Sequence, residues 1–181
     1  MSLTSREIRL MGARLIVPRS TATNAYDLLM DVAAVIEEEP RRYNQEDWLV
    51  RVEPSEVYEG KVESGPSCGT VGCRAGWIVE LAGAWDKDAD KDPIVTWFGG
   101  GVAGAARRIL GVNWGRSPGE EYAREMQFDM AITRLFDGAA LSGRDLRIGT
   151  PEYAAAGAAG VREFAETWKE RLLATAVATN R

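Results

Sequence analysis

The apolar residues of this chain recur at three- and four-residue spacing in several separate segments. In the first clear one, the recurring residues are Tyr26, Leu28, Leu29, Val32, Ala33, Val35 and Ile36. This spacing places the apolar side chains on one face of a helix, for which Thr21 or Thr23 can serve as the cap. Pro40 disfavours helical geometry in the residue before it, so the helix is predicted to end at about Glu39.

A second helix is predicted over residues 71–81, where the pattern is almost wholly apolar. Its only charged residues are Arg74 and Glu80. A helix that is apolar around most of its circumference is covered by neighbours on several sides. We therefore expect a buried central helix, capped by Thr70 and ended by Gly83.

Two further helices are predicted, a short one and the last one of the chain. The short helix is predicted from about Gly101 to Leu110, with Gly111 as its terminator. Thr150 and Pro151 have the residue types of a cap and a first helical residue, so they predict the start of a long C-terminal helix. Its apolar residues lie mostly on one side: Tyr153, Val161, Phe164, Trp168, Leu172 and Ala176.

Between these two helices, the sequence has a strong start signal for another. Ser117, Pro118 and Glu120 have the residue types of a cap, a first helical residue and the acid of a capping box. The helix is predicted to end at Gly138 and to be interrupted near Asp129. Its predicted apolar face consists of Tyr122, Met126, Ala131, Ile132, Leu135 and Phe136.

Strand signals are weak. Residues 8–17 can form a short strand or a frayed helix, and a minor strand pair near residues 8–17 and 48–62 is the most that the pattern supports. The length of 181 residues suits one domain. The fold prediction is therefore mainly α, a single compact domain of about five helices with at most a minor β-hairpin near the N-terminal half. Residues 1–20 form an N-terminal extension, and 139–150 a loop before the long C-terminal helix.

Charge and hydropathy exclude some functions. The chain has 27 acidic and 22 basic residues, a net charge of −5, and no sustained basic stripe that could neutralise a series of phosphates. Nucleic-acid binding is therefore disfavoured. No apolar run approaches the roughly 20 residues that span a bilayer, and the N-terminus lacks the pattern of a secretory leader. We expect a cytoplasmic protein without a membrane segment.

The chain contains no histidine and two cysteines. The absence of imidazole removes the Ser-His-Asp and Cys-His arrangements and every zinc site that needs a histidine ligand. Two cysteines cannot complete a site of four thiolates. We therefore predict no catalytic residue, no metal site and no cofactor, which favours a protein that is not an enzyme.

The thiols of Cys68 and Cys73 allow three interpretations. A cysteine in the first turn of a helix capped by Thr70 would be favoured as a thiolate by the helix dipole. Four intervening residues would also allow a disulfide, although a cytoplasmic setting disfavours one. Because the surrounding sequence is apolar and lacks a base, packing in the interior is the favoured interpretation.

A glycine-rich segment has the G-x-G-x-x-G spacing of a dinucleotide-binding loop, with glycines at positions 99, 101 and 104. The helix that follows is predicted to stop near Gly111, and no second strand with a terminal acid follows it. The spacing therefore favours close approach of two helices over nucleotide binding.

Three of the six tryptophans flank the loops around this segment, at positions 85, 97 and 114. Aromatic residues at loop edges can form a binding pocket or a partner surface. The predicted ligand-binding residues are therefore Trp85, Trp97, Gly99, Gly101, Gly104 and Trp114.

Several motifs resemble a signature of small uncharacterised actinobacterial and phage proteins: E-x-P with an aromatic residue, Q-x-x-W, C-G-T-x-x-C-x-A-G-W/H, A-x-x-L-L-G-L and a later L-F. The matching residues are Glu38, Pro40, Tyr43, Gln45, Trp48, Cys68, Gly69, Thr70, Cys73, Ala75, Gly76, Trp77, Ala106, Ile109, Leu110, Gly111, Val112, Leu135 and Phe136. Ile109 and Val112 replace leucines of the signature. The resemblance covers roughly residues 24–138 and implies a compact helical protein, without implying an activity.

The function prediction is a non-enzymatic helical interaction or ligand-binding protein of bacterial or phage origin. Its partner would be another protein, a small ligand or a second copy of the chain. Two alternatives stay open: a thiol-dependent enzyme that uses Cys73, and a nucleotide-binding protein that uses the loop from Gly99 to Gly104.

Overall fold

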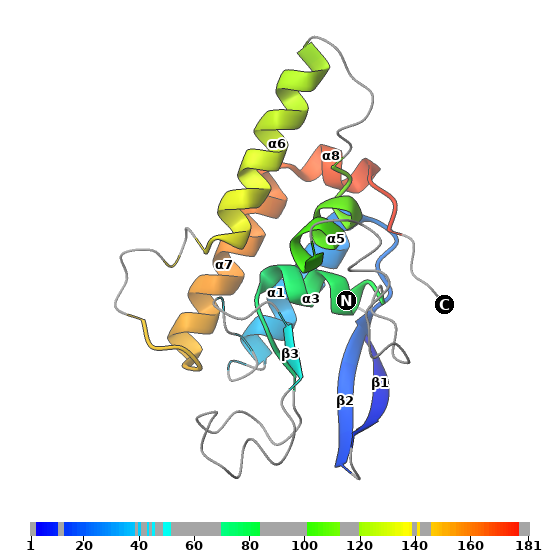
Figure 1. Ribbon diagram of the computed structural model, residues 1–181, viewed down its shortest axis with the longest axis vertical. Helices are drawn as coiled ribbons and strands as arrows, with labels where there is room; N and C mark the ends of the chain where they lie inside the picture. The colour runs from blue at the N-terminus through cyan, green and yellow to red at the C-terminus, as the bar shows by residue number, and fades with distance from the viewer. Residues whose placement is uncertain are drawn as a thin grey trace.

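The computed structural model describes residues 3–10, 13–38, 40, 43, 45, 49–51, 70–83, 101–112, 120–138, 141 and 146–177. Its helices are α1 (Ala25–Glu38), α3 (Arg74–Leu81), α5 (Gly101–Ile109), α6 (Glu120–Phe136), α7 (Pro151–Thr167) and α8 (Lys169–Ala174). The fold is mainly α, as predicted from the sequence, and the helices form a single compact domain (Figure 1).

The described strands form two short antiparallel pairs. β1 (Leu3–Leu10) pairs with β2 (Ala13–Ser20), and β3 (Leu49–Arg51) pairs with β4 (Thr70–Gly72). The hairpin expected near the N-terminal half is present as β1 and β2, but the finer pairing of residues 8–17 with 48–62 was wrong, because residues 8–17 are divided between β1 and β2. The segment near residue 50 instead finds its partner just before α3.

The helical core is built around α1, which packs along α7 and also contacts α3 and α8, while α3 packs against α5. All eight residues of α3 are buried, including Arg74 and Glu80. The prediction of a covered central helix is therefore confirmed. Its predicted start was wrong, since Thr70 lies in β4 and Cys73 is the residue that precedes the first helical turn.

The start of α1 also differs from the prediction. The side-chain oxygen of Asn24 accepts a hydrogen bond from the N–H of Asp27 at 2.9 Å, so Asn24 caps the helix in place of Thr21 or Thr23. The backbone on either side of Asn24 is paired with the C-terminal segment, because Ala25 donates to the carbonyl of Thr175 at 3.0 Å. This pairing joins the beginning of the helical core to its end.

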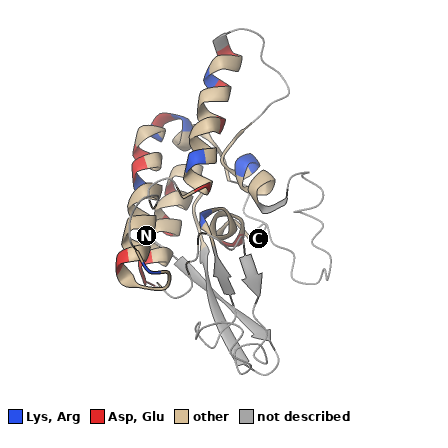
Figure 2. Cartoon of the chain, turned by 60° about the vertical axis from the view of Figure 1, so that its left-hand side comes forward, with Lys and Arg blue, Asp and Glu red and all other residues tan. Residues whose placement is uncertain are grey.

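The predicted apolar face of α6 is only half correct. Ile132, Leu135 and Phe136 are buried, together with Phe128, which the prediction did not include. Tyr122 and Met126 are exposed by 47% and 40%. The reason is visible in Figures 1 and 2, where the N-terminal half of α6 extends beyond the ends of the other helices.

The last helical segment starts as predicted and ends earlier. The Thr150 hydroxyl accepts a hydrogen bond from the N–H of Tyr153 at 3.3 Å, and Pro151 is the first helical residue. The backbone leaves helical geometry at Trp168, with φ −110° and ψ 21°, which separates α7 from α8. Ala176 lies beyond α8 and bridges to Asn24, so it is not part of the helical face.

Three polar residues connect the end of α1 with α6 and α7. The Tyr43 hydroxyl donates to Gln45 Oε1 at 2.9 Å, and the N–H of Gln45 donates to the Tyr153 hydroxyl at 3.1 Å. The Gln45 side-chain amide also donates to the carbonyl of Phe136. Through Gln45, these contacts connect the end of α6 with the start of α7, next to the candidate site.

Candidate functional site

The described structure contains two of the six residues predicted to bind a ligand. Gly101 is the first residue of α5, and Gly104 lies in its second turn. Trp85, Trp97, Gly99 and Trp114 lie outside the described residues. The predicted site around the glycine-rich loop therefore stays a prediction.

Cys73 precedes α3 and is 2% exposed. Burial raises the pKa of its thiol, although the neighbouring backbone N–H groups of Gly76 and Ala75 act in the opposite direction. A raised pKa disfavours the thiolate that a nucleophile requires. Cys68 lies outside the described residues, so the proposed disulfide stays a prediction.

The next residue, Arg74, connects the start of α3 with the end of α6. Its Nη1 donates a hydrogen bond to the carbonyl oxygen of Leu135 at 2.7 Å. Leu135 lies in the last turn of α6. The backbone carbonyl oxygens of a last turn have no N–H partner within the helix, so they need a donor from elsewhere. This bond gives Arg74 a structural function, but it uses only one of the three guanidinium nitrogens.

The other two nitrogens of Arg74, Nε and Nη2, are buried and have no hydrogen-bond partner among the residues that the structure describes. The side chain is 1% exposed. Burial lowers the pKa of Arg74, while the neighbouring Tyr43 and Tyr153, including a side-chain hydrogen bond with Tyr43, act in the opposite direction. Arginine nevertheless stays protonated in proteins, so this is a buried cation with unsatisfied donors, which is costly without a partner.

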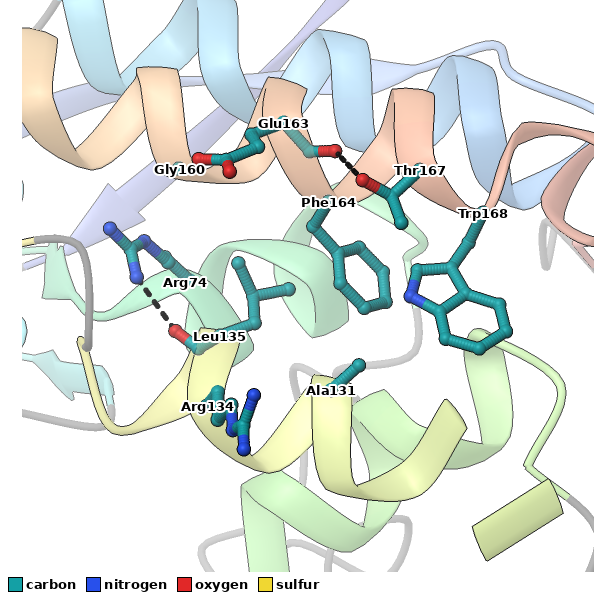
Figure 3. A pocket seen from close by; sticks show the side chains of 9 residues that line it. All are labelled: Arg74, Ala131, Arg134, Leu135, Gly160, Glu163, Phe164, Thr167 and Trp168. Carbon is teal, nitrogen blue, oxygen red and sulfur yellow. Dashed lines mark hydrogen bonds between the residues drawn. The ribbon is translucent and has the colours of Figure 1, made fainter. Parts of the chain in front are cut away.

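Arg74 lines a cavity of about 320 Å³ between α6 and α7. The lining includes Arg74, Arg134, Leu135, Glu163, Phe164 and Trp168. Figure 3 shows the charged groups of Arg74 and Glu163 toward one end of the cavity and the two aromatic rings at the other. Neither Arg134 nor Glu163 forms an ion pair within the part of the chain that the structure describes.

The aromatic end of the cavity is supported from behind by Phe128. Its ring stacks on Phe164 with centroids 5.9 Å apart and meets Trp168 edge-on at 5.0 Å. The guanidinium of Arg171 also lies over the ring of Phe128, 3.9 Å from its centroid. Rings packed in this way form a preformed apolar wall.

A second cavity, of about 400 Å³, lies beside the start of α1 and includes Thr23, Tyr26 and Asp31 in its lining. The carboxylate of Asp31 is 4% exposed and accepts a hydrogen bond from the Ser20 hydroxyl at 2.6 Å. Burial raises the pKa of Asp31, and the bond from Ser20 opposes the effect. Because this carboxylate already has a partner, it does not indicate a missing ligand.

Within the described residues, no group of three or more cysteines and acids could hold a metal ion, and no helix is long and apolar enough to cross a membrane. In the view of Figure 2, basic and acidic residues are interspersed on the helices. Comparison with family models, with curated proteins and with solved structures finds no match for this chain. The resemblance to actinobacterial and phage proteins therefore stays a prediction.

Sequence reasoning missed the residues of this cavity. Arg74 was noted only as one of two charges in an apolar segment, and neither Arg134 nor Glu163 stood out. A charged residue within an otherwise apolar helix was the available signal, because burying such a charge needs a compensating contact.

Proposed function

We propose that this protein is a non-enzymatic helical binding protein, and that the cavity between α6 and α7 binds a small ligand with an anionic group at Arg74. The observation that carries this proposal is the buried guanidinium whose Nε and Nη2 have no hydrogen-bond partner in the described part of the chain. An anion would supply the missing acceptors, because two oxygens of a carboxylate or phosphate match two guanidinium N–H groups.

The competing interpretation is that Arg74 serves only to cap α6. The cap needs one donor, and Nη1 provides it through the bond to Leu135. The cap and the side-chain hydrogen bond with Tyr43 still leave Nε and Nη2 without a partner among the described residues, and burying them costs free energy that a neutral side chain would avoid. A ligand that binds the same group offsets that cost.

Access to Arg74 requires a local movement. The side chain is 1% exposed, so a ligand oxygen reaches it only when the guanidinium turns toward the cavity that it lines.

Binding is favoured over catalysis by the chemistry of the lining. Glu163 is a carboxylate that could accept a proton, but in the described lining the one hydroxyl group, that of Thr167, donates to the backbone carbonyl of Glu163 and not to its carboxylate. Nucleophilic catalysis needs a nucleophile and a base within hydrogen-bond reach. The alternatives of a thiol enzyme at Cys73 and a nucleotide site at Gly99 to Gly104 stay predictions, as do a protein partner, a homo-oligomer, a cytoplasmic location and a bacterial or phage origin.

The proposal is tested by titrating acetate, benzoate and phosphate into the full chain at constant ionic strength, with calorimetry or NMR chemical shifts as the readout. At least one anion should bind to the wild type. Arg74→Met should lose this binding, whereas Arg124→Met, the same change at an exposed position of α6, should retain it. The absence of binding to the wild type, or equal binding by Arg74→Met, would overturn the proposal.

A further inference from the structure

The cavity at Arg74 is not uniformly cationic. Arg74 and Arg134 are contributed by α3 and α6, and the carboxylate Glu163 is contributed by α7. A ligand with only a negative charge would be attracted by the two guanidinium groups and repelled by Glu163. In a ligand with both charges, the negative group would be attracted by Arg74 and Arg134, and the positive group by Glu163.

The two kinds of charge are on opposing walls of the same end of the cavity. Figure 3 shows Arg74 beside Leu135, and Glu163 on the turn of α7 that faces them. Arg134 and Glu163 are both exposed and form no ion pair in the described part of the chain, so both are available to a ligand. An ammonium group and a carboxylate on one small molecule match this arrangement.

The other end of the cavity is apolar. Phe164 is buried, Trp168 is partly buried, and both rings are held by Phe128. A side chain placed there would be removed from water against a preformed surface. The volume of about 320 Å³ is within the usual range for pockets that bind small molecules.

We infer that the ligand is a free α-amino acid with an apolar side chain. Its carboxylate binds Arg74, its ammonium group binds Glu163, and its side chain packs against Phe164 and Trp168. This inference rests on the proposed function, because it needs the anion site at Arg74. It goes further by assigning the second charge of the ligand and the apolar group.

The test uses three forms of the same compound: free leucine, N-acetyl-leucine and leucine amide. Each is titrated into the full chain by calorimetry. Because a charged hydrogen-bond partner is lost with either block, free leucine should bind about tenfold more tightly than each blocked form. Free phenylalanine, tested in parallel, should behave in the same way as free leucine.

Glu163→Gln isolates the contribution of the ammonium group. This variant should bind free leucine no better than N-acetyl-leucine, while its affinity for N-acetyl-leucine stays equal to that of the wild type or increases. Glu170→Gln, an exposed position of α8 outside the cavity, is the matched control and should preserve the preference for the free amino acid.

The outcomes separate the two proposals. If N-acetyl-leucine binds the wild type as tightly as free leucine, the amino-acid inference is overturned and the anion site stands. If neither the simple anions nor the amino acids bind, both are overturned. Binding of leucine amide alone would also contradict both, because it would place the affinity at Glu163 and not at Arg74.

Discussion

Gly157 of α7 lies directly against the ring of Tyr43. A Cβ atom placed on Gly157 would be 2.3 Å from Cε1 of Tyr43 and 2.8 Å from its hydroxyl oxygen. The ring cannot move away easily, because it is fully buried and packs on Tyr153 with centroids 5.3 Å apart, and because its hydroxyl donates a hydrogen bond to Gln45 Oε1. The missing side chain therefore allows the segment after α1 to pack on the backbone of α7.

We predict that Gly157→Ala destabilises the protein. Alanine is favoured over glycine in a helix by about 1 kcal/mol, but overpacking a buried site costs about 1–3 kcal/mol, and here the clash is with a fixed ring. Urea unfolding should show a lower free energy of unfolding for the variant. In a Tyr43→Leu background the same change should cost less, and an equal cost in both backgrounds would contradict the contact.

The unsatisfied guanidinium of Arg74 predicts an unusual stability effect. Arg74→Met removes a buried charge with two unpartnered nitrogens, at the expense of one hydrogen bond to Leu135. We expect the free energy of unfolding without ligand to stay the same or to rise, because replacing buried charges by apolar side chains is often neutral or stabilising. A loss of about 2 kcal/mol or more in urea unfolding would instead identify Arg74 as a structural cap.

A pH-dependent effect is expected at Asp31, whose pKa is raised by burial. The stability that such a group contributes is fully present below its unfolded-state pKa of about 3.9 and is lost as the pH rises through the folded-state pKa. Asp31→Asn keeps an acceptor for the Ser20 hydroxyl and removes the charge. The variant should be more stable than the wild type at neutral pH.

The advantage of Asp31→Asn should shrink as the pH falls toward about 4, where the wild-type carboxyl becomes protonated. Thermal unfolding of both proteins over a pH series measures this difference, and groups that do not interact with Asp31 contribute equally to both proteins. A variant less stable than the wild type at neutral pH would be inconsistent with a buried, costly carboxylate.

Exposed and buried apolar residues of α6 are expected to differ in how much they stabilise the fold. Met126 and Met130 are exposed by 40% and 52%, whereas Ile132 is fully buried. Replacing both methionines by glutamine should change the free energy of unfolding by less than about 0.5 kcal/mol. Ile132→Ala should cost about 2–5 kcal/mol. A large loss of unfolding free energy in the glutamine variant would mean that Met126 and Met130 are covered in the folded protein.

The elements that were predicted well have local signals. The apolar spacing located α1, and Thr150 with Pro151 located the start of α7. Gly111 was predicted to end the short helix, and it does so with φ at 85°, a conformation that glycine adopts without strain. Each of these signals depends only on residues close together in the sequence, so it can be recognised without the tertiary structure.

The elements that were predicted wrongly depend on distant contacts. The spacing of Tyr122 and Met126 defines a face of α6, but whether that face is buried depends on the reach of α7, whose residues come later in the chain. The break at Trp168 falls where its ring packs against Phe128 of α6, 40 residues earlier in the chain. The cap at Asn24 is a local contact with Asp27 that the sequence contained and the prediction overlooked. The spacing of apolar residues along a helix does not indicate which distant segment will cover them.

By itself, the sequence determined that this is a mainly helical chain with a buried central helix and without the side chains of the commonest catalytic triads. Composition and local spacing are sufficient for those conclusions, because helix formation and amphipathic burial act over a few residues. Only the tertiary structure decided that Arg74 meets the end of α6, across 61 residues of sequence, and lines a cavity with Glu163. The partners of a buried charge come from packing between elements, and no local pattern encodes which elements will meet.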